Sequence, residues 1–408
     1  PMSSPWILKQ DRTLANQAQD ASPRGMQLSI YDAKFRGIIA QAAVICAVAA
    51  FAYFIVSNTA RNLLDRGIST GFGFVSNPAG YDVSQMLVTF SEPITHGQMF
   101  IIGLLNTLLV AGFGIVMATM LGLVMGIMRM SRNWLSAGVA YAYVDSLRNV
   151  PVLLQILFWY GVLLALPGVR QSIDLLGIAQ LNNRGLFVPA PVAQQGFGLV
   201  AWAFAAAVAA TVVLAVWARK RQHVTGQTFP VLYSGIALIV LLPVGVYFAA
   251  GMPLEWDMPV QKGFGFKGGV VISPEFVTLL LALVLYTGTY IAEIFRSAIQ
   301  SVSTGQKEAA AALGLQPGHM MKLVLIPQAL RVAVPQLTSQ YLNLTKNSSL
   351  AVAIGYPDLV ATFGGTTLNQ TGQAVEVIAI TMGVYLTISL LISLFMNWFN
   401  ARVALKER

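Results

Sequence analysis

Charged residues are scarce in this chain. Only 10% of its 408 residues are Asp, Glu, Lys or Arg, whereas a soluble globular protein carries about a quarter. Hydrophobic residues make up 56% of the chain and the mean hydropathy is +0.67. This composition excludes an ordinary soluble protein and places the chain in a lipid bilayer.

Groups that bind metals or carry covalent chemistry are also rare. Cys46 is the sole cysteine, which excludes intrachain disulfides and cysteine-based zinc sites. The three histidines, His96, His223 and His319, form no metal-binding motif. No Walker A phosphate loop, paired catalytic carboxylates or nucleophile elbow occurs. We therefore predict no catalytic residue, no metal site and no cofactor bound by this chain.

Eight apolar stretches are long enough to cross a hydrocarbon core of about 30 Å. They cover residues 37–56, 100–128, 150–166, 198–218, 231–250, 276–294, 332–354 and 377–397. The pattern predicts an all-α polytopic membrane protein with about eight transmembrane helices. An even number of spans puts both termini on one side of the membrane.

Lysine and arginine are distributed unevenly between the two sides. Eighteen lie in the tails and the loops on the side of the termini, and six lie in the opposite loops. This count assigns Arg129, Arg132 and Arg148 to one loop on the terminal side. By the positive-inside rule both termini face the cytoplasm. The net charge of +9 is then explained by topology, and we predict no nucleic-acid partner.

A short alanine-rich segment, GQKEAAAALGL at residues 305–315, lies between the sixth and seventh stretches. Glu308 near the start of a short helix is favoured by the helix dipole. Gly314 can adopt the left-handed conformation that ends a helix, and Pro317 lets a second helix begin in a new direction. The segment therefore predicts a compact helix that protrudes into the cytoplasm.

This segment resembles the EAA loop of bacterial ATP-binding-cassette (ABC) importer permeases of the histidine, glutamine and polar amino-acid family. Arg296 and Ala298 precede it, and the runs IPQA at 326–329 and LTKNSSL at 344–350 follow it. A generic amphipathic surface helix would fit the alanines, but not the family's spacing. The resemblance covers residues 103–397 with one large insertion. It implies that a partner ATPase grips six coupling residues, namely Gly305, Gln306, Glu308, Ala309, Ala310 and Gly314.

The added first span and the inserted spans make the chain similar to the longer permeases of general L-amino-acid importers. The resemblance implies a five-helix type I importer (MetI-like) core plus one N-terminal and two inserted spans. The expected division is a cytoplasmic tail (1–36), an extra transmembrane helix (37–57), a periplasmic loop (58–98), core helices (99–168), the insertion (169–273), core helices with the EAA loop at 296–331 (274–400), and a cytoplasmic tail (401–408).

The resemblance also implies the partners of the chain and its location in the cell. The chain would be a permease and not an enzyme, in the inner membrane of a bacterium. It would pair with a second, homologous permease chain as a heterodimer, with two ATPase subunits that bind ATP and Mg, and with a periplasmic amino-acid-binding protein. Broad or polar and acidic L-amino acids are the expected substrates. An ion-coupled secondary transporter or a channel subunit is the alternative, and it predicts flux without ATP.

Two further patterns concern helix packing and the third span. Gly114, Ala118, Gly122 and Gly126 recur every four residues and predict a face for close helix packing. The stretch from Arg148 to Gln155, RNVPVLLQ, resembles the entrance to the third span in the same family. We interpret Arg148 as a topological anchor paired with Asp145, in preference to a gating residue.

A polar face in the seventh span is the candidate translocation path. Polar groups at membrane depth normally face a bundle interior or a wet cavity, so these residues either bond neighbouring helices or line the path. Glu293 in the sixth span is expected to pair with a nearby cation. Lys346 could attract a substrate carboxylate, hold the gate, or pair with Asp358 or Glu293. The candidate path residues are Gln336, Gln340, Asn343, Lys346 and Tyr290.

Overall fold

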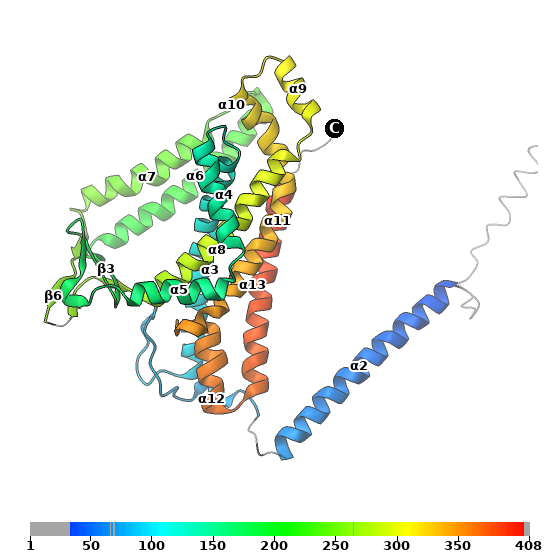
Figure 1. Cartoon of the computed structure of the whole chain (residues 1–408), viewed down its shortest axis with the longest axis vertical. Helices are drawn as coiled ribbons and strands as arrows, with labels where there is room; N and C mark the ends of the chain where they lie inside the picture. The colour runs from blue at the N-terminus through cyan, green and yellow to red at the C-terminus, as the bar shows by residue number, and fades with distance from the viewer. Residues whose placement is uncertain (1–32, 66, 68–69, 264, 404–408) are drawn as a thin grey trace, which may run out of the picture. The chain divides into compact units, whose positions relative to one another are not determined.

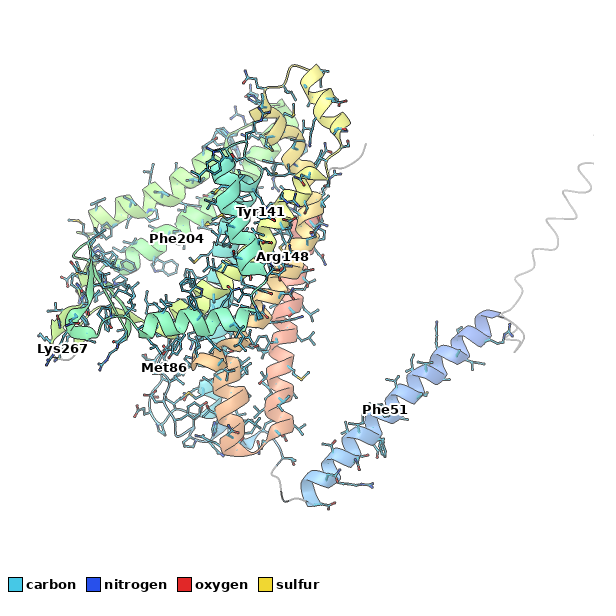
Figure 2. All side chains as sticks on the ribbon, in the orientation of Figure 1. Phe51, Met86, Tyr141, Arg148, Phe204 and Lys267 are labelled. Carbon is cyan, nitrogen blue, oxygen red and sulfur yellow. The ribbon has the colours of Figure 1, made fainter. Side chains whose placement is uncertain are left out.

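The computed structural model describes residues 33–65, 67, 70–263 and 265–403 (Figure 1). The chain forms two compact units, Pro1–Thr70 and Gly71–Arg408. The described part of the first unit is α2 (Ala33–Asp65), a 33-residue helix with exposed apolar side chains such as Phe51, labelled in Figure 2. Its length of about 50 Å is enough to span a bilayer. The predicted cytoplasmic tails lie largely outside the described residues.

Helices make up most of the second unit. They are α3 (His96–Arg129), α4 (Trp134–Arg148), α5 (Val152–Leu164), α6 (Phe197–Thr225), α7 (Val231–Ala249), α8 (Pro274–Gln300), α9 (Thr304–Ala312), α10 (Pro317–Met320), α11 (Ile326–Asn347), α12 (Leu368–Thr371) and α13 (Ala374–Val403). Short 3-10 or π segments are η1 (Gly73–Ser76), η2 (Val169–Gln171), η3 (Met321–Leu325), η4 (Ser348–Ile354) and η5 (Val360–Thr367).

Helix α8 lies at the centre of the bundle and contacts α3, α4, α5 and α11. Its start is set by the sequence: the Ser273 hydroxyl accepts a hydrogen bond from the backbone N–H of Phe276 at 3.2 Å, and Pro274 occupies the first turn. Its most apolar window is 61% buried, the largest share among the candidate spans of the described residues. Movement of α8 would therefore affect the packing of α3, α4, α5 and α11.

The predicted packing face on α3 is confirmed. A Cβ on Gly122 would lie 2.5 Å from Cγ2 of Ile291, and one on Gly126 would lie 2.9 Å from the carbonyl oxygen of Ala292, both on α8. A Cβ on Gly114 would lie 3.0 Å from the Leu344 side chain on α11. Small residues thus let α3 approach two neighbours within the same chain.

The predicted count of eight spans is not confirmed. Among the described residues, α2, α3, α6, α7, α8 and α13 are long and apolar enough to cross a membrane, which gives six spans. A bent pair, α4 and α5, can be counted as a seventh. The stretch predicted at 332–354 is not among them, because polar side chains on α11 lower its hydropathy, and the α-helix ends at Asn347.

The span predicted at 150–166 is replaced by a broken helix. Helix α5 has only 13 residues, about 20 Å, which is too short to cross the membrane. It meets α4 at 105°, because Pro151 has no N–H with which to continue α4. The residues of α4, which the sequence assigned to the loop before the third span, thus form a helix that packs on α3 and α8. Arg148 is the last residue of α4 (Figure 2), whereas Arg129 ends α3 and Arg132 lies between α3 and α4.

The insertion contains strands, so the second unit is not purely helical. Strands β1 (Ile173–Leu175), β2 (Ala179–Asn182), β3 (Gly185–Val188) and β8 (Val270–Ile272) form one antiparallel sheet in that order. Two hairpins pair β4 (Ala190–Ala193) with β5 (Leu254–Asp257), and β6 (Val260–Lys262) with β7 (Gly265–Lys267). Helices α6 and α7 pack on each other beside these strands (Figure 1).

Candidate functional site

The alanine-rich segment forms α9, which begins after Ser303 and ends at Ala312. Two backbone hydrogen bonds close its last turn: the N–H of Gly314 donates to the carbonyl of Ala311 at 2.9 Å, and that of Leu315 donates to the carbonyl of Ala310 at 3.1 Å. This pair of bonds is a Schellman motif. Gly314 has φ +74°, so the predicted left-handed helix stop is confirmed.

Most of the predicted coupling residues lie on the surface of this short helix. Gly305, Gln306, Glu308 and Ala309 are exposed, as is Gly314. Ala310 is different: it is only 3% exposed, so it packs inside the loop and leaves contact with a partner to its neighbours. The part of each residue in coupling stays a prediction.

Leu313 is a surface residue that the sequence analysis missed. It is 81% exposed at the end of α9, which makes it a candidate contact for a docking partner. The signal was present in the sequence, since Leu313 directly precedes the glycine that ends the helix and so lies at its tip.

The segment after α9 connects it to the bundle without a long flexible loop. Pro317 occupies the first turn of α10, as predicted. The π-helical segment η3 follows and continues directly into α11. A hydrogen bond from the Gln328 amide to the side-chain oxygen of Gln306, at 3.3 Å, ties α9 to the start of α11. Helix α9 is therefore connected to α8 on one side and to α11 on the other.

A polar cavity of about 280 Å³ lies between α4, α8 and α11. Its lining comprises Arg148, Tyr290, Glu293, Ile294, Ser297, Gln336, Ser339 and Gln340. Three of the five candidate path residues, Tyr290, Gln336 and Gln340, are thus brought together. Asn343 and Lys346 are exposed on α11 and do not line this cavity.

Arg148 contacts an aromatic ring and not the carboxylate predicted for it. Its guanidinium carbon lies 4.8 Å from the centre of the Tyr290 ring, within the range of a cation–π interaction. The Tyr290 hydroxyl is 3.0 Å from that of Tyr286, one turn earlier on α8. Among the described ion pairs, Arg148 has none with Asp145.

Glu293 is paired with cations, as predicted. Its carboxylate forms ion pairs with Arg129 at the end of α3 and with Arg296 one turn later on α8, and the Arg296 Nε–H also donates to it at 3.1 Å. Arg129 further lies 5.2 Å from the centre of the Tyr141 ring on α4. Among the described residues, Lys346 forms no ion pair with Asp358 or with Glu293, its two expected partners.

The charges around the cavity do not cancel. Arg148 and the cluster of Arg129, Arg296 and Glu293 together contribute three guanidinium groups and one carboxylate. Such a site attracts a carboxylate, and an adjacent aromatic face and amides can bind the rest of a small ligand.

Gln155 holds the break between α4 and α5. Its side-chain amide donates to the backbone carbonyls of Leu147, at 2.8 Å, and Val150, at 3.0 Å. These carbonyls lie where α4 ends and have no helical partner. The buried glutamine therefore satisfies the backbone at the bend and fixes the position of Arg148, a role that the sequence motif indicated only by resemblance.

Comparison with known proteins identifies the family. The chain is 49% identical over 401 residues to the general L-amino acid transport system permease protein AapQ of Rhizobium johnstonii, covering 97% of this chain and 100% of that protein. Residues 223–405 match the family described as binding-protein-dependent transport system inner membrane component. The chain belongs to this permease family. The family resemblance predicted from the EAA loop is confirmed.

Two other relatives cover nearly the whole permease. The putative amino-acid ABC transporter permease protein YhdX of Escherichia coli is 47% identical, covering 93% of this chain and 97% of that protein. The glutamate/glutamine/aspartate/asparagine transport system permease protein BztB of Rhodobacter capsulatus is 41% identical, covering 96% and 99%. The first span and the insertion are thus included in relatives of similar length. The matched family region contains α8, α9 and α11, which carry the EAA loop and two walls of the cavity.

Proposed function

We propose that this chain is the permease subunit of an ATP-driven, binding-protein-dependent importer of L-amino acids. The observation that carries the proposal is the connection between α9 and the polar cavity. The exposed helix α9 is joined on one side to α8 and on the other to α11, and both helices line the cavity. A force on α9 would therefore move two walls of the cavity together.

The proposal includes the partners that the family resemblance implies. Two ATPase subunits, which hold ATP and Mg, dock on α9 through Glu308, Leu313 and their neighbours. A second, homologous permease chain completes the pore as a heterodimer, and a periplasmic binding protein delivers the amino acid. The chain lies in the bacterial inner membrane with both termini in the cytoplasm. This orientation takes the bent pair α4 and α5 as one crossing and α11 with the segment that follows it as another. With Arg148 left out of the cytoplasmic count, 17 cations then still face six, so the positive-inside argument keeps its direction.

The transport cycle requires no covalent chemistry in this chain. ATP hydrolysis in the partner subunits supplies the free energy. In this chain, α9 passes the motion to α8 and α11, and the bundle changes between outward-open and inward-open states. The clamp of Glu293 on Arg129 and Arg296 keeps α3 attached to α8 during this movement.

The polar cavity explains how an amino acid would be bound during transport. Arg148 would hold the substrate carboxylate, since a guanidinium offers two parallel N–H donors to a carboxylate. Gln336 and Gln340 would bond a polar or acidic side chain. Asn343 and Lys346 would continue the polar face along α11. The names of AapQ and BztB support L-amino acids as substrates.

Uptake by the reconstituted importer tests this proposal. With Glu308→Lys, we expect ATP-dependent uptake of labelled L-glutamate into proteoliposomes to fall at least ten-fold, because the reversed charge opposes ATPase docking; Glu308 is the fifth residue of α9, so the predicted support from the helix dipole does not apply. The control is Glu255→Lys, which reverses an exposed carboxylate in the insertion and should leave uptake unchanged. Equal uptake by Glu308→Lys and the parent would reject the coupling role of α9.

Co-expression of this chain with the proteins encoded by neighbouring genes, followed by purification of the complex, tests the heterodimer. An active complex containing this chain, the ATPase and no other permease would reject it. Uptake of a sugar or a metal ion and of no amino acid would reject the substrate class.

A further inference from the structure

A second cavity lies in the bundle, apart from the polar one. It measures about 580 Å³ and is enclosed by the ends of α3 and α8, by η3 and by the start of α11. Its walls are apolar and include Leu123, Ile127, Phe295, Ile299 and Leu330, with Ser131 as the one polar lining residue. It shares no lining residue with the polar cavity. A volume of this size can hold a small-molecule-sized ligand.

The rim of this apolar cavity is cationic. Arg132 follows the lining residue Ser131, and Lys322 follows the lining residue Met321; both cations are exposed. No Asp or Glu occurs at residues 128–144 or 309–357, so neither segment supplies a carboxylate to neutralise them. A ligand that suits the whole site is apolar at one end and anionic at the other.

The rim also carries a residue typical of a membrane surface. Trp134 begins α4, directly after the turn that contains Arg132, and is 82% exposed. Exposed tryptophan is enriched at the headgroup level of bilayers. Given the proposed orientation, on which this inference rests, the rim lies at the cytoplasmic headgroup level and the cavity opens into the inner leaflet.

We propose that this cavity binds an anionic phospholipid, with an acyl chain against Ile127 and Phe295 and the phosphate at Arg132 and Lys322. Basic pockets between helices on the cytoplasmic side are suited to lipid headgroups. The acyl chain alone gives no preference for one lipid, since the surrounding bilayer is equally apolar. The headgroup gives the preference, at roughly a factor of five for each cation near an anionic surface.

A protein helix fits the cavity less well. A helix about 10 Å wide would fill 580 Å³ in little more than one turn, which leaves most of a transmembrane helix outside. It would also have to bring carboxylates to the rim. The described part of α2, the apolar helix of this chain that a second copy could offer, contains Asp65 as its one acid.

Photo-crosslinking of the full-length chain in nanodiscs tests the site. The probes are phosphatidylglycerol and phosphatidylcholine with the same diazirine-bearing acyl chain, each added at low mole fraction. We expect phosphatidylglycerol to label peptides that contain Ile127 or Phe295 roughly ten-fold or more above phosphatidylcholine, with the difference shrinking at high salt because the charges are screened.

Two variants, each with its control, distinguish the contribution of the headgroup contacts from that of the apolar cavity. Arg132→Gln with Lys322→Gln should bring the two lipids to within about two-fold, whereas Arg219→Gln with Lys220→Gln, exposed cations at the end of α6, should change nothing. Ala329→Phe, which fills the cavity, should remove the labelling, whereas Ala209→Phe on the exposed surface of α6 should not. The charge variants leave the apolar walls intact and so remain informative if Ala329→Phe fails to fold.

Three results would overturn the proposal. They are equal labelling by both lipids in the parent, labelling that none of these variants reduces, and no labelling of peptides that contain Ile127 or Phe295 by either lipid. The labelling requires neither ATP nor an amino acid. A failure here is therefore distinguishable from a failure of transport or of its coupling to an ATPase.

Discussion

The backbone conformation of Gly314 determines how α9 ends. A residue with a Cβ at φ +74° is strained by roughly 1–2 kcal/mol, although the space around this glycine is open. Most of the Schellman cap depends on that single angle, since both closing hydrogen bonds follow from it.

We expect Gly314→Ala to loosen the end of α9 and to lower transport several-fold while the ATPase continues to turn over. Hydrogen exchange of residues 304–315 would show the loosening as faster exchange. Gly318→Ala is the matched control, because Gly318 is exposed, has no neighbour within 4 Å of an added Cβ and has no positive φ. Unchanged exchange in Gly314→Ala would mean that the cap does not depend on glycine.

Gln155 is the second residue with one defined structural role, which is to hydrogen-bond the backbone at the bend between α4 and α5. Replacement by Met keeps its approximate shape but leaves the carbonyls of Leu147 and Val150 without their donor. We expect a loss of about 1–3 kcal/mol in stability, since buried polar groups lose their hydrogen bonds. Thermal unfolding in detergent would measure this as a lower Tm. The control Leu154→Met changes an exposed neighbour, and an equal Tm for the two variants would contradict this role.

At the scale of elements, the contact between α3 and α8 depends on the absence of side chains. Gly122→Ala would place a Cβ 2.5 Å from Ile291 and 3.0 Å from the carbonyl oxygen of Gly288. Because the second neighbour is backbone, the helices must separate, at a cost of about 1–3 kcal/mol. We expect a lower Tm and more aggregate on size-exclusion chromatography. Gly112→Ala on the same helix meets no atom within 4 Å and should be neutral; a neutral Gly122→Ala would refute the packing face.

The broken helix formed by α4 and α5 is the element that sequence patterns described least well. Apolarity located the stretch at 150–166, and Pro151 indicated a helix start. The 105° bend also depends on Gln155 and on the contact of Arg148 with Tyr290, a residue more than a hundred positions away. Long-range contacts of this kind leave no local periodicity, so the sequence predicts a span at 150–166 preceded by a loop.

For the whole molecule, the orientation in the membrane can be measured with cysteines. In a Cys46→Ser background, Leu176→Cys and Leu313→Cys place single thiols at sites that are 93% and 81% exposed in the parent. We expect a membrane-impermeant maleimide to label Leu176→Cys in spheroplasts and to label Leu313→Cys only after the membrane is opened. The opposite pattern would show that α9 faces outward and would remove the proposed contact with an ATPase.

The sequence by itself determined the membrane location, the helix start at Pro317, the glycine stop at Gly314 and the family. These depend on composition, on caps and on short motifs, which act over a few residues. The tertiary structure decided which polar residues share a cavity, that Arg148 contacts Tyr290, that Ala310 is buried and that an apolar cavity lies under a cationic rim. The physical reason is that burial and charge pairing join helices far apart in the chain, whereas sequence periodicity reports only which face of one helix is apolar.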